Sequence, residues 1–409
     1  MDSLASQRDL ATSSAKDGRR VLSVACGAHA VLDGFTDGLL LLLPIWQGAF
    51  GLSYGEVGFL RTLFSGAMAT FQIPAGALAV GGRGPMVLAL GTAITGTGFL
   101  VMGLSGGLLA LTIGLALAGF GASAQHPIAS DLVAKAYPGP RSRAMLGTYN
   151  FAGDVGKIAL PAALALLLTM VPWRAATMVL GFVGLAAGAT IFLMLRTPRS
   201  PRPEPVGGGA APAAAAPATS PRRGFPVLMA LGMVDSATRS AFLTFLPFLL
   251  VAKGADLPTI GIALALVFAG GAAGKLACGF LGARIGVLRT VLLTEGATAL
   301  GIATLLPLPL VPGLALLPLI GVALNGTSSV LYGSVPEFAK AGASARAFGI
   351  FYTATIGASA CAPLLFGLVG DVVGVPTTML VIAAAVLATL PLAFGLSLME
   401  RGATTPPAR

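Results

Sequence analysis

The stretch VLSVACGAHAVLDGFTDGLLLLLPIWQ, residues 21–47, combines two properties that seldom occur together. It is long and apolar enough to cross the hydrocarbon core of a bilayer, which takes about 17 to 25 residues in a helix. It also carries Asp33 and Asp37 in its interior, where a charged side chain costs roughly 2.5 to 3.5 kcal/mol on the mildest insertion scale. The stretch therefore predicts a membrane helix that faces a polar cavity.

The composition extends this prediction to the whole chain. Of 409 residues, 56% are hydrophobic and 10% are charged, whereas a soluble globular protein has about a quarter of its residues charged. The net charge of +10 comes from basic residues in short joints between apolar runs, which indicates membrane topology rather than nucleic-acid binding. No nucleotide-binding, haem or metalloprotease motif is present, so we expect neither an enzyme nor a cofactor. The polar first 20 residues also predict no cleaved signal peptide.

Twelve segments satisfy the length and polarity of a membrane helix. They are residues 21–47, 56–80, 84–105, 107–136, 142–170, 173–195, 225–251, 257–282, 286–306, 312–339, 344–370 and 375–398.

The basic residues also predict the orientation of these segments. Of the 25 Lys and Arg residues, two, Arg174 and Lys253, fall on the side opposite the amino terminus. Four more lie inside spans, so the remaining 19 lie on the same side as the amino terminus; the four are Arg61, Lys157, Arg239 and Lys275. Positive loops stay inside, so we expect both termini in the cytoplasm and the chain in the inner (plasma) membrane.

A polar break divides the spans into six and six. Residues 196–224 are rich in Pro, Ala and Gly without apolar periodicity, which is typical of a flexible linker. We therefore expect five regions: a cytoplasmic tail (1–20), a six-helix bundle (21–195), the cytoplasmic linker (196–224), a second six-helix bundle (225–398) and a cytoplasmic tail (399–409).

The two halves resemble each other at a nearly constant offset. Asp33, Asp37 and Pro44 in the first span correspond to Asp235, Arg239 and Pro247 in the seventh. A parallel duplication of this kind predicts two pseudo-symmetric bundles with a site at their interface.

Twelve spans, a central linker and a six-plus-six repeat resemble the major facilitator superfamily over essentially the whole chain. The family's loop motif, Gly-x-Leu-x-Asp-Arg-x-Gly-x-x-Arg, has one counterpart at Gly279–Arg289, which keeps Gly279, Arg284 and Arg289. The other counterpart, after the second span, keeps Gly76 and a displaced Arg83. Both counterparts lack the acidic residue, so the resemblance implies gating loops without the usual charged latch.

The fourth span contains a more particular resemblance. The stretch Gly119–Ser130 includes His126-Pro127-x-x-Ser130, which is similar to fosmidomycin-resistance exporters. This resemblance favours export as the direction of transport. For His126 itself we prefer a kink beside Pro127 to a proton relay.

Buried charge supplies the candidate site. At 1.5 Å per residue Asp33 lies roughly 18 Å deep, near the middle of the membrane, and His29, Asp33 and Asp37 share one helix face. Acids of this kind can carry a coupling proton; the candidates are Asp33, Asp37, Asp154 and Asp235. Candidates for binding the cargo are His29, Arg61, Tyr149, Asn150, Lys157 and Arg239, of which Tyr149 and Asn150 follow only from the resemblance.

The same residues allow plainer interpretations. Asp154 with Lys157 and Asp235 with Arg239 can neutralise each other within one helix, and Arg61 can reach water at the membrane surface. The sulfurs of Met229 and Met233 could bind copper, but two His and three scattered Cys favour core packing. We therefore expect no metal site.

The favoured function is a monomeric, proton-coupled secondary transporter that exports a small polar or anionic compound by alternating access. Its partners would be the cargo, protons and the lipid bilayer, with no nucleic acid. Proton-linked uptake of an organic anion or nutrient is one alternative. A transporter-like sensor or scaffold without flux is the other.

Overall fold

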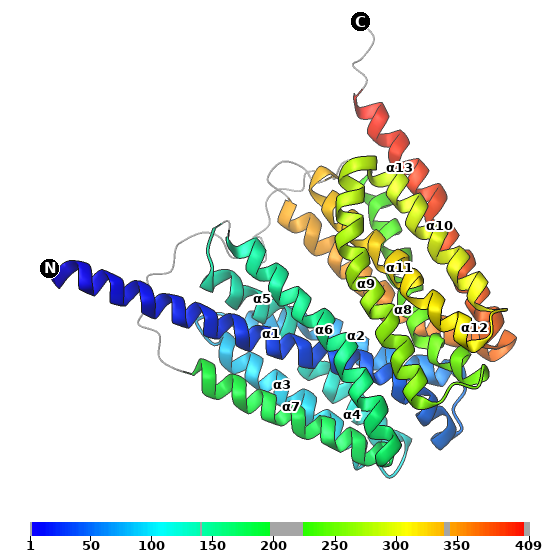
Figure 1. Cartoon of the computed structure of the whole chain (residues 1–409), viewed down its shortest axis with the longest axis horizontal. Helices are drawn as coiled ribbons and strands as arrows, with labels where there is room; N and C mark the ends of the chain where they lie inside the picture. Colours follow the sequence, from blue (N-terminus) through cyan, green and yellow to red (C-terminus); the bar gives the residue numbers. More distant parts are fainter. Residues whose placement is uncertain (1, 140, 197–223, 339–343, 405–409) are drawn as a thin grey trace, which may run out of the picture. The chain divides into compact units, whose positions relative to one another are not determined.

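A computed structural model of the chain describes residues 2–139, 141–196, 224–338 and 344–404. All regular elements in these ranges are helices (Figure 1). Most of the predicted linker, residues 197–223, lies outside the described residues. Both predicted tails contain helix: the first helix already begins at Asp2, and the last one continues to Thr404.

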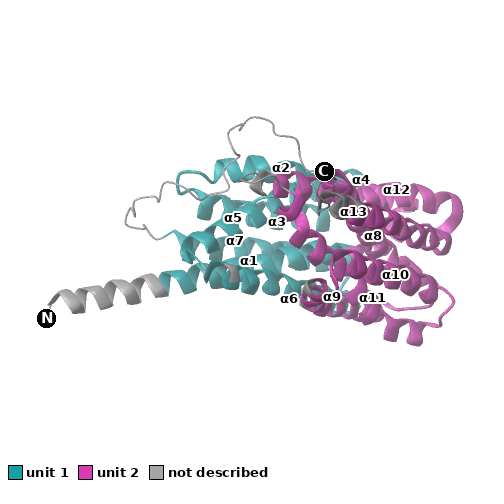
Figure 2. Cartoon of the chain, turned by 90° about the horizontal axis from the view of Figure 1, so that it is seen from above, with its two compact units in different colours: residues 1–39, 63–208 teal, residues 40–62, 209–409 magenta. Residues whose placement is uncertain are grey.

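The chain forms two compact units (Figure 2). The first contains residues 1–39 and 63–208, and the second contains residues 40–62 and 209–409. The end of α1 (Asp2–Phe50) and the start of α2 (Tyr54–Leu78) therefore belong to the second unit, although their sequence belongs to the first half. The predicted bundle limits, 21–195 and 225–398, stay a prediction.

Hydrogen bonds attach the start of α2 to the second unit. The backbone N–H groups of Tyr54 and Gly55 donate to the Asp371 carboxylate over 2.6 Å and 3.0 Å. These N–H groups have no acceptor within their own helix, because the first turn lacks a preceding carbonyl. One turn further, Gly58 lies against the backbone of Pro363, where any side chain would collide. An acid far away in the sequence thus caps α2.

The other helices of the first unit are α3 (Gly84–Gly103), α4 (Leu108–Ala122), α5 (Gln125–Ala136), α6 (Arg141–Met170) and α7 (Trp173–Leu195). Helix α3 packs against both α7 and α4 (Figure 1). Gly96 packs against the α7 backbone and Gly98 against the α4 backbone, so closely that a Cβ atom at either position would collide. Small residues at such contacts let membrane helices approach closely.

The predicted fourth span is interrupted rather than continuous. Helix α4 ends at Ala122 and α5 begins at Gln125, so the break lies just before His126 and Pro127. Proline has no N–H to donate to Ser123 one turn earlier, and its ring is best accommodated in the first turn of a helix. The expected local break is therefore present, slightly upstream, and it places His126 in the first turn of α5.

The second unit contains α8 (Phe225–Ala252), α9 (Leu257–Ile285), α10 (Val287–Leu305), α11 (Leu310–Phe338), α12 (Ser344–Leu387) and α13 (Thr389–Thr404). Helix α9 packs on α11 through Gly270 and Gly321, each against the facing backbone. Helix α12 contains one non-helical residue, Gly374, with φ 76°. This residue separates the last two predicted spans.

Ten segments of the described chain are long and apolar enough to cross a membrane. Twelve were predicted, and the difference has two sources. The last segment, Ala347–Ser397, joins the two final predicted spans across Gly374. Helix α2 falls outside the ten, and its sequence includes Glu56, Arg61 and Gln72.

Candidate functional site

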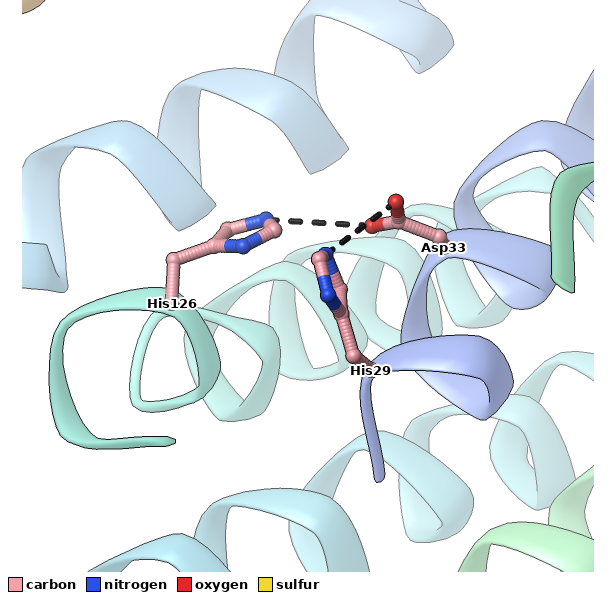
Figure 3. Close-up of side chains that lie close together, drawn as sticks. All are labelled: His29, Asp33 and His126. Atoms are coloured by element: carbon pink, nitrogen blue, oxygen red, sulfur yellow. Dashed lines mark ion pairs between the residues drawn. The ribbon is translucent and has the colours of Figure 1, made fainter. Parts of the chain in front are cut away.

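A cluster of charged and aromatic side chains occupies the interior of the first unit. Helix α1 supplies His29 and Asp33, which lie one turn apart on the same face. Helix α5 supplies His126, and α6 supplies Tyr149 and Lys157. Figure 3 shows His29 and Asp33 of α1 and His126 of α5 pointing toward one another.

The carboxylate of Asp33 is the centre of this cluster. Its Oδ2 atom lies 3.2 Å from Lys157 Nζ and 3.3 Å from His29 Nε2, and its Oδ1 atom lies 3.8 Å from His126 Nε2 (Figure 3). Lys157 also lies 3.9 Å from Asp154 Oδ1. The Lys157 ammonium group thus lies between two carboxylates, and its shorter contact is to Asp33 of α1.

A backbone hydrogen bond orients the His29 ring. Its Nδ1 lies 2.9 Å from the carbonyl oxygen of Tyr149, and the ring stacks on the Tyr149 ring with centroids 4.1 Å apart. A carbonyl oxygen can only accept, so Nδ1 carries the hydrogen. The Nε2 atom of a neutral His29 therefore presents its lone pair to Asp33.

Glycines of α6 bring these groups together. A Cβ atom at Gly153 would lie 2.7 Å from Asp33 Oδ2, and one at Gly156 would collide with the backbone carbonyl of Ala30. Helix α6 can approach α1 this closely only without side chains at these positions. The sequence Gly153-Asp154-Val155-Gly156 therefore allows Lys157, one residue later, to reach Asp33.

A second charged cluster lies in the second unit. Arg239 Nη2 donates to Asp235 Oδ2 over 3.3 Å, one turn along α8, and to Ser236 Oγ over 3.2 Å. Ser328 of α11 donates to the same Asp235 oxygen over 3.1 Å and accepts a hydrogen bond from Arg239 Nη1. Asp235 is buried and held by donors from two helices.

The remaining predicted site residues are distributed unevenly. Asp37 is buried, and its charge acts on Lys157 in the first cluster. Arg61 is buried in the second unit, whereas Asn150 is exposed. The gating-loop residues occupy helix ends and turns: Gly76 lies near the end of α2, Gly279 near the end of α9, and Arg83, Arg284 and Arg289 are exposed.

Two members of these clusters are not among the predicted site residues. The sequence favours a kink over a proton relay at His126, and it does not single out Ser328. The signal for Ser328 was a polar Asn325-Gly-Thr-Ser-Ser run inside an otherwise apolar span. The partner of a hydroxyl group cannot be read from its own helix, because the contact depends on how α11 is rotated toward α8.

The first cluster also contains donors suited to a metal ion. His29, Asp33 and His126 present ligand atoms that all lie within 4.8 Å of one another. In the described part of the chain this is the one group of three such residues. Elsewhere, buried Glu295 of α10 accepts a hydrogen bond from Thr389 of α13 over 3.5 Å.

Long apolar helices around a few buried charged side chains define an integral, multi-pass membrane protein. The family model described as Major Facilitator Superfamily matches residues 25–234 and 228–408. The chain belongs to this superfamily. It is therefore a transporter rather than an enzyme.

Solved structures support the same fold. A bacterial homolog of the human lysosomal transporter Spinster, in an inward-facing and unoccupied conformation, has a TM-score of 0.77 at 16% identity, covering 96% of this chain and 99% of that one. The nucleoside transporter NupG, as a D323A mutant, has a TM-score of 0.73 at 14% identity, covering 94% and 99%. At such identities the likeness concerns the fold alone. No curated protein matches the chain in sequence.

Proposed function

We propose that this chain is a proton-coupled secondary active transporter that exports a small polar or anionic compound by alternating access. The observation that carries this proposal is the Asp235 carboxylate, which is buried but held by partners that can change. Arg239 and Ser328 both donate hydrogen bonds to Asp235 Oδ2, and the Arg239 side chain is 20% exposed. A cargo molecule can therefore replace either partner.

Coupling follows from the energetics of buried charge. Removing the cationic partner of a buried carboxylate leaves an uncompensated charge, which costs about 3 to 5 kcal/mol, so the carboxylate gains a proton instead. A cargo that donates hydrogen bonds to ionised Asp235 competes with the proton for this group. Such competition exchanges cargo for protons, as an exporter requires, and the His126-Pro127-x-x-Ser130 stretch favours the same direction.

Cargo with an acidic group would bind a half-buried cation, either Lys157 of the first unit or Arg239 of the second. Each is paired with a carboxylate, at 3.2 Å for Lys157 with Asp33 and 3.3 Å for Arg239 with Asp235. Asp33, Asp37 and Asp154 remain further candidates for proton coupling, and the coupling step proposed here does not depend on them. Both termini would lie in the cytoplasm.

Proton-linked uptake of an organic anion is the second candidate function, and the Arg239–Asp235 pair favours it. If the cargo anion takes Arg239 as its partner, Asp235 loses its cation and binds a proton together with the cargo. Anion and proton would then move in the same direction.

Flux measurements in proteoliposomes with an imposed pH gradient separate these functions. Exchange of cargo against protons supports export, and movement of both in one direction supports uptake. The Asp235→Asn variant should lose pH-driven flux and keep counterflow exchange, because the Asn side chain cannot release a proton. Driven flux equal to that of the unsubstituted chain would refute the coupling role, and silence across a broad panel of polar and anionic compounds would favour a sensor or scaffold.

A further inference from the structure

The two histidines of the chain meet at one carboxylate. The sequence contains 2 His among 409 residues, at positions 29 and 126, and each directs Nε2 toward Asp33. They come from α1 and α5, so helix packing brings them together rather than proximity in sequence (Figure 3). We propose that His29, Asp33 and His126 bind a divalent transition-metal ion. This inference goes beyond the transport function and does not depend on it.

The separations of the donor atoms suit a small ion. Ligands at 2.0 to 2.2 Å from a tetrahedral metal lie about 3.3 to 3.6 Å from one another. His29 Nε2 is 3.3 Å from Asp33 Oδ2, and His126 Nε2 is 3.8 Å from Asp33 Oδ1. All three ligand atoms lie within 4.8 Å of one another, and the His126 side chain is 28% exposed.

The hydrogen bond to Tyr149 prepares His29 as a ligand. Histidines that bind metal usually donate their other ring nitrogen to a carbonyl or carboxylate, which fixes the tautomer. His29 Nδ1 is directed in this way to the Tyr149 carbonyl oxygen at 2.9 Å. The Nε2 atom of the neutral ring then carries a lone pair 3.3 Å from a carboxylate oxygen, and a proton or a metal ion can bridge two such acceptors.

The donor types indicate the class of ion. Imidazole nitrogen with carboxylate oxygen suits zinc, cobalt and nickel, whereas magnesium and calcium prefer oxygen alone and cuprous copper prefers sulfur. Three protein ligands leave a fourth position of a tetrahedral ion open to water or another molecule. An exchangeable zinc-class ion is therefore expected.

Lys157 is the competitor of this ion. Its ammonium group lies 3.2 Å from Asp33 Oδ2, where the positive charge of a metal would otherwise act. It also lies 3.9 Å from Asp154 Oδ1, so it has a second carboxylate to which it can move on its flexible stem. The metal ion and Lys157 are thus alternative cations for Asp33. Replacing a histidine ligand should therefore lower the metal affinity, and replacing Lys157 should raise it.

Titration of the purified full-length chain with Co²⁺ and Zn²⁺ tests the site, using an affinity tag without histidine. Co²⁺ should produce visible absorption bands of a nitrogen-ligated ion at one equivalent per chain, and Zn²⁺ should displace it. His29→Gln and His126→Gln should each weaken binding at least about tenfold. Lys157→Met should strengthen it, because the competing charge is removed.

Asp235→Asn provides the matched control, since it neutralises a buried acid of the second unit and should leave Co²⁺ affinity unchanged. His126 lies at the edge of the cluster, so His126→Gln should fold even if His29→Gln does not. Absence of stoichiometric bands, unchanged affinity in a folded histidine variant, or a Lys157→Met variant that binds no better would overturn the site. Because the experiment measures metal binding, it can refute the metal site whatever the transport assays show.

Discussion

Two acids at matching positions of the predicted repeat are the centres of two different clusters. Asp33 pairs with Lys157 of another helix, whereas Asp235 pairs with Arg239 one turn along its own helix. The internal pairing of Asp235 agrees with the plainer interpretation drawn from its i, i+4 spacing. Ser328 adds a donor from α11 that spacing could not reveal. At the residue scale, the charged residues can be identified in the sequence, but their partners depend on how the helices pack.

We expect Arg239→Gln to lower the stability of the second unit by about 3 kcal/mol, the lower end of the range for breaking a buried pair, because Arg239 retains some exposure. The variant leaves Asp235 buried without its cation. The double variant Asp235→Asn with Arg239→Gln should recover most of the loss, because no unpaired charge remains. Thermal unfolding in detergent measures both, and a double variant no more stable than the single one would show that the pair contributes little.

At the scale of elements, glycine decides which helices meet. The interface of α6 with α1 includes glycines at which any side chain would collide, and so do the interfaces of α3 with α7 and of α9 with α11. These contacts follow from glycines that the sequence places inside apolar runs. The sequence predicted the helix limits to within a few residues for most spans, but it could not predict which glycines face a neighbour.

Gly156→Ala should destabilise the first unit by about 1 to 3 kcal/mol, as overpacking usually does, because its Cβ would collide with the Ala30 carbonyl of α1. Gly147→Ala in the same helix is the control. Nothing lies within 4 Å of its Cβ position, so it should be neutral or stabilise by about 0.5 to 1 kcal/mol. Equal effects of the two changes on the thermal unfolding midpoint would contradict the packing described here.

The start of α9 should depend on pH. A hydrogen bond from the Thr259 side chain, together with one from its backbone N–H at 2.9 Å, holds the pKa of Asp256 below its ordinary value of 3.8. Because the folded pKa is the lower one, the stabilisation is present above pH 3.8 and is lost as the pH falls through the folded value. Asp256→Asn keeps an acceptor oxygen but does not titrate.

The difference in unfolding midpoint between the chain and its Asp256→Asn variant should therefore shrink as the pH is lowered from neutral to about 3. A constant difference across this range would mean that the charge of Asp256 does not stabilise α9.

At the scale of the whole molecule, the compact units do not coincide with the sequence halves. Residues 40–62 group with the second unit, held there by Asp371 and by close backbone contacts of Gly58 and Gly367.

Asp371→Ala should increase hydrogen exchange at the start of α2, because the N–H groups of Tyr54 and Gly55 lose their acceptor. Peptides from α3 and α7 serve as an internal reference and should exchange at unchanged rates. Asp256→Ala removes a cap within a single helix and should affect only the start of α9. Unchanged exchange over residues 54–58 in the Asp371 variant would show that other contacts hold this segment.

By itself, the sequence determined that the chain crosses the membrane many times and where most helices begin and end, and it predicted acids and bases at mid-membrane depth. These properties depend on hydropathy, length and proline or glycine along a single helix, which are local. Only the tertiary structure decided that both histidines meet at Asp33, that Ser328 joins Asp235, that Asn150 is exposed and that α2 begins against α12. Such partners depend on the rotation and close approach of helices distant in sequence, which the pattern of one helix does not contain.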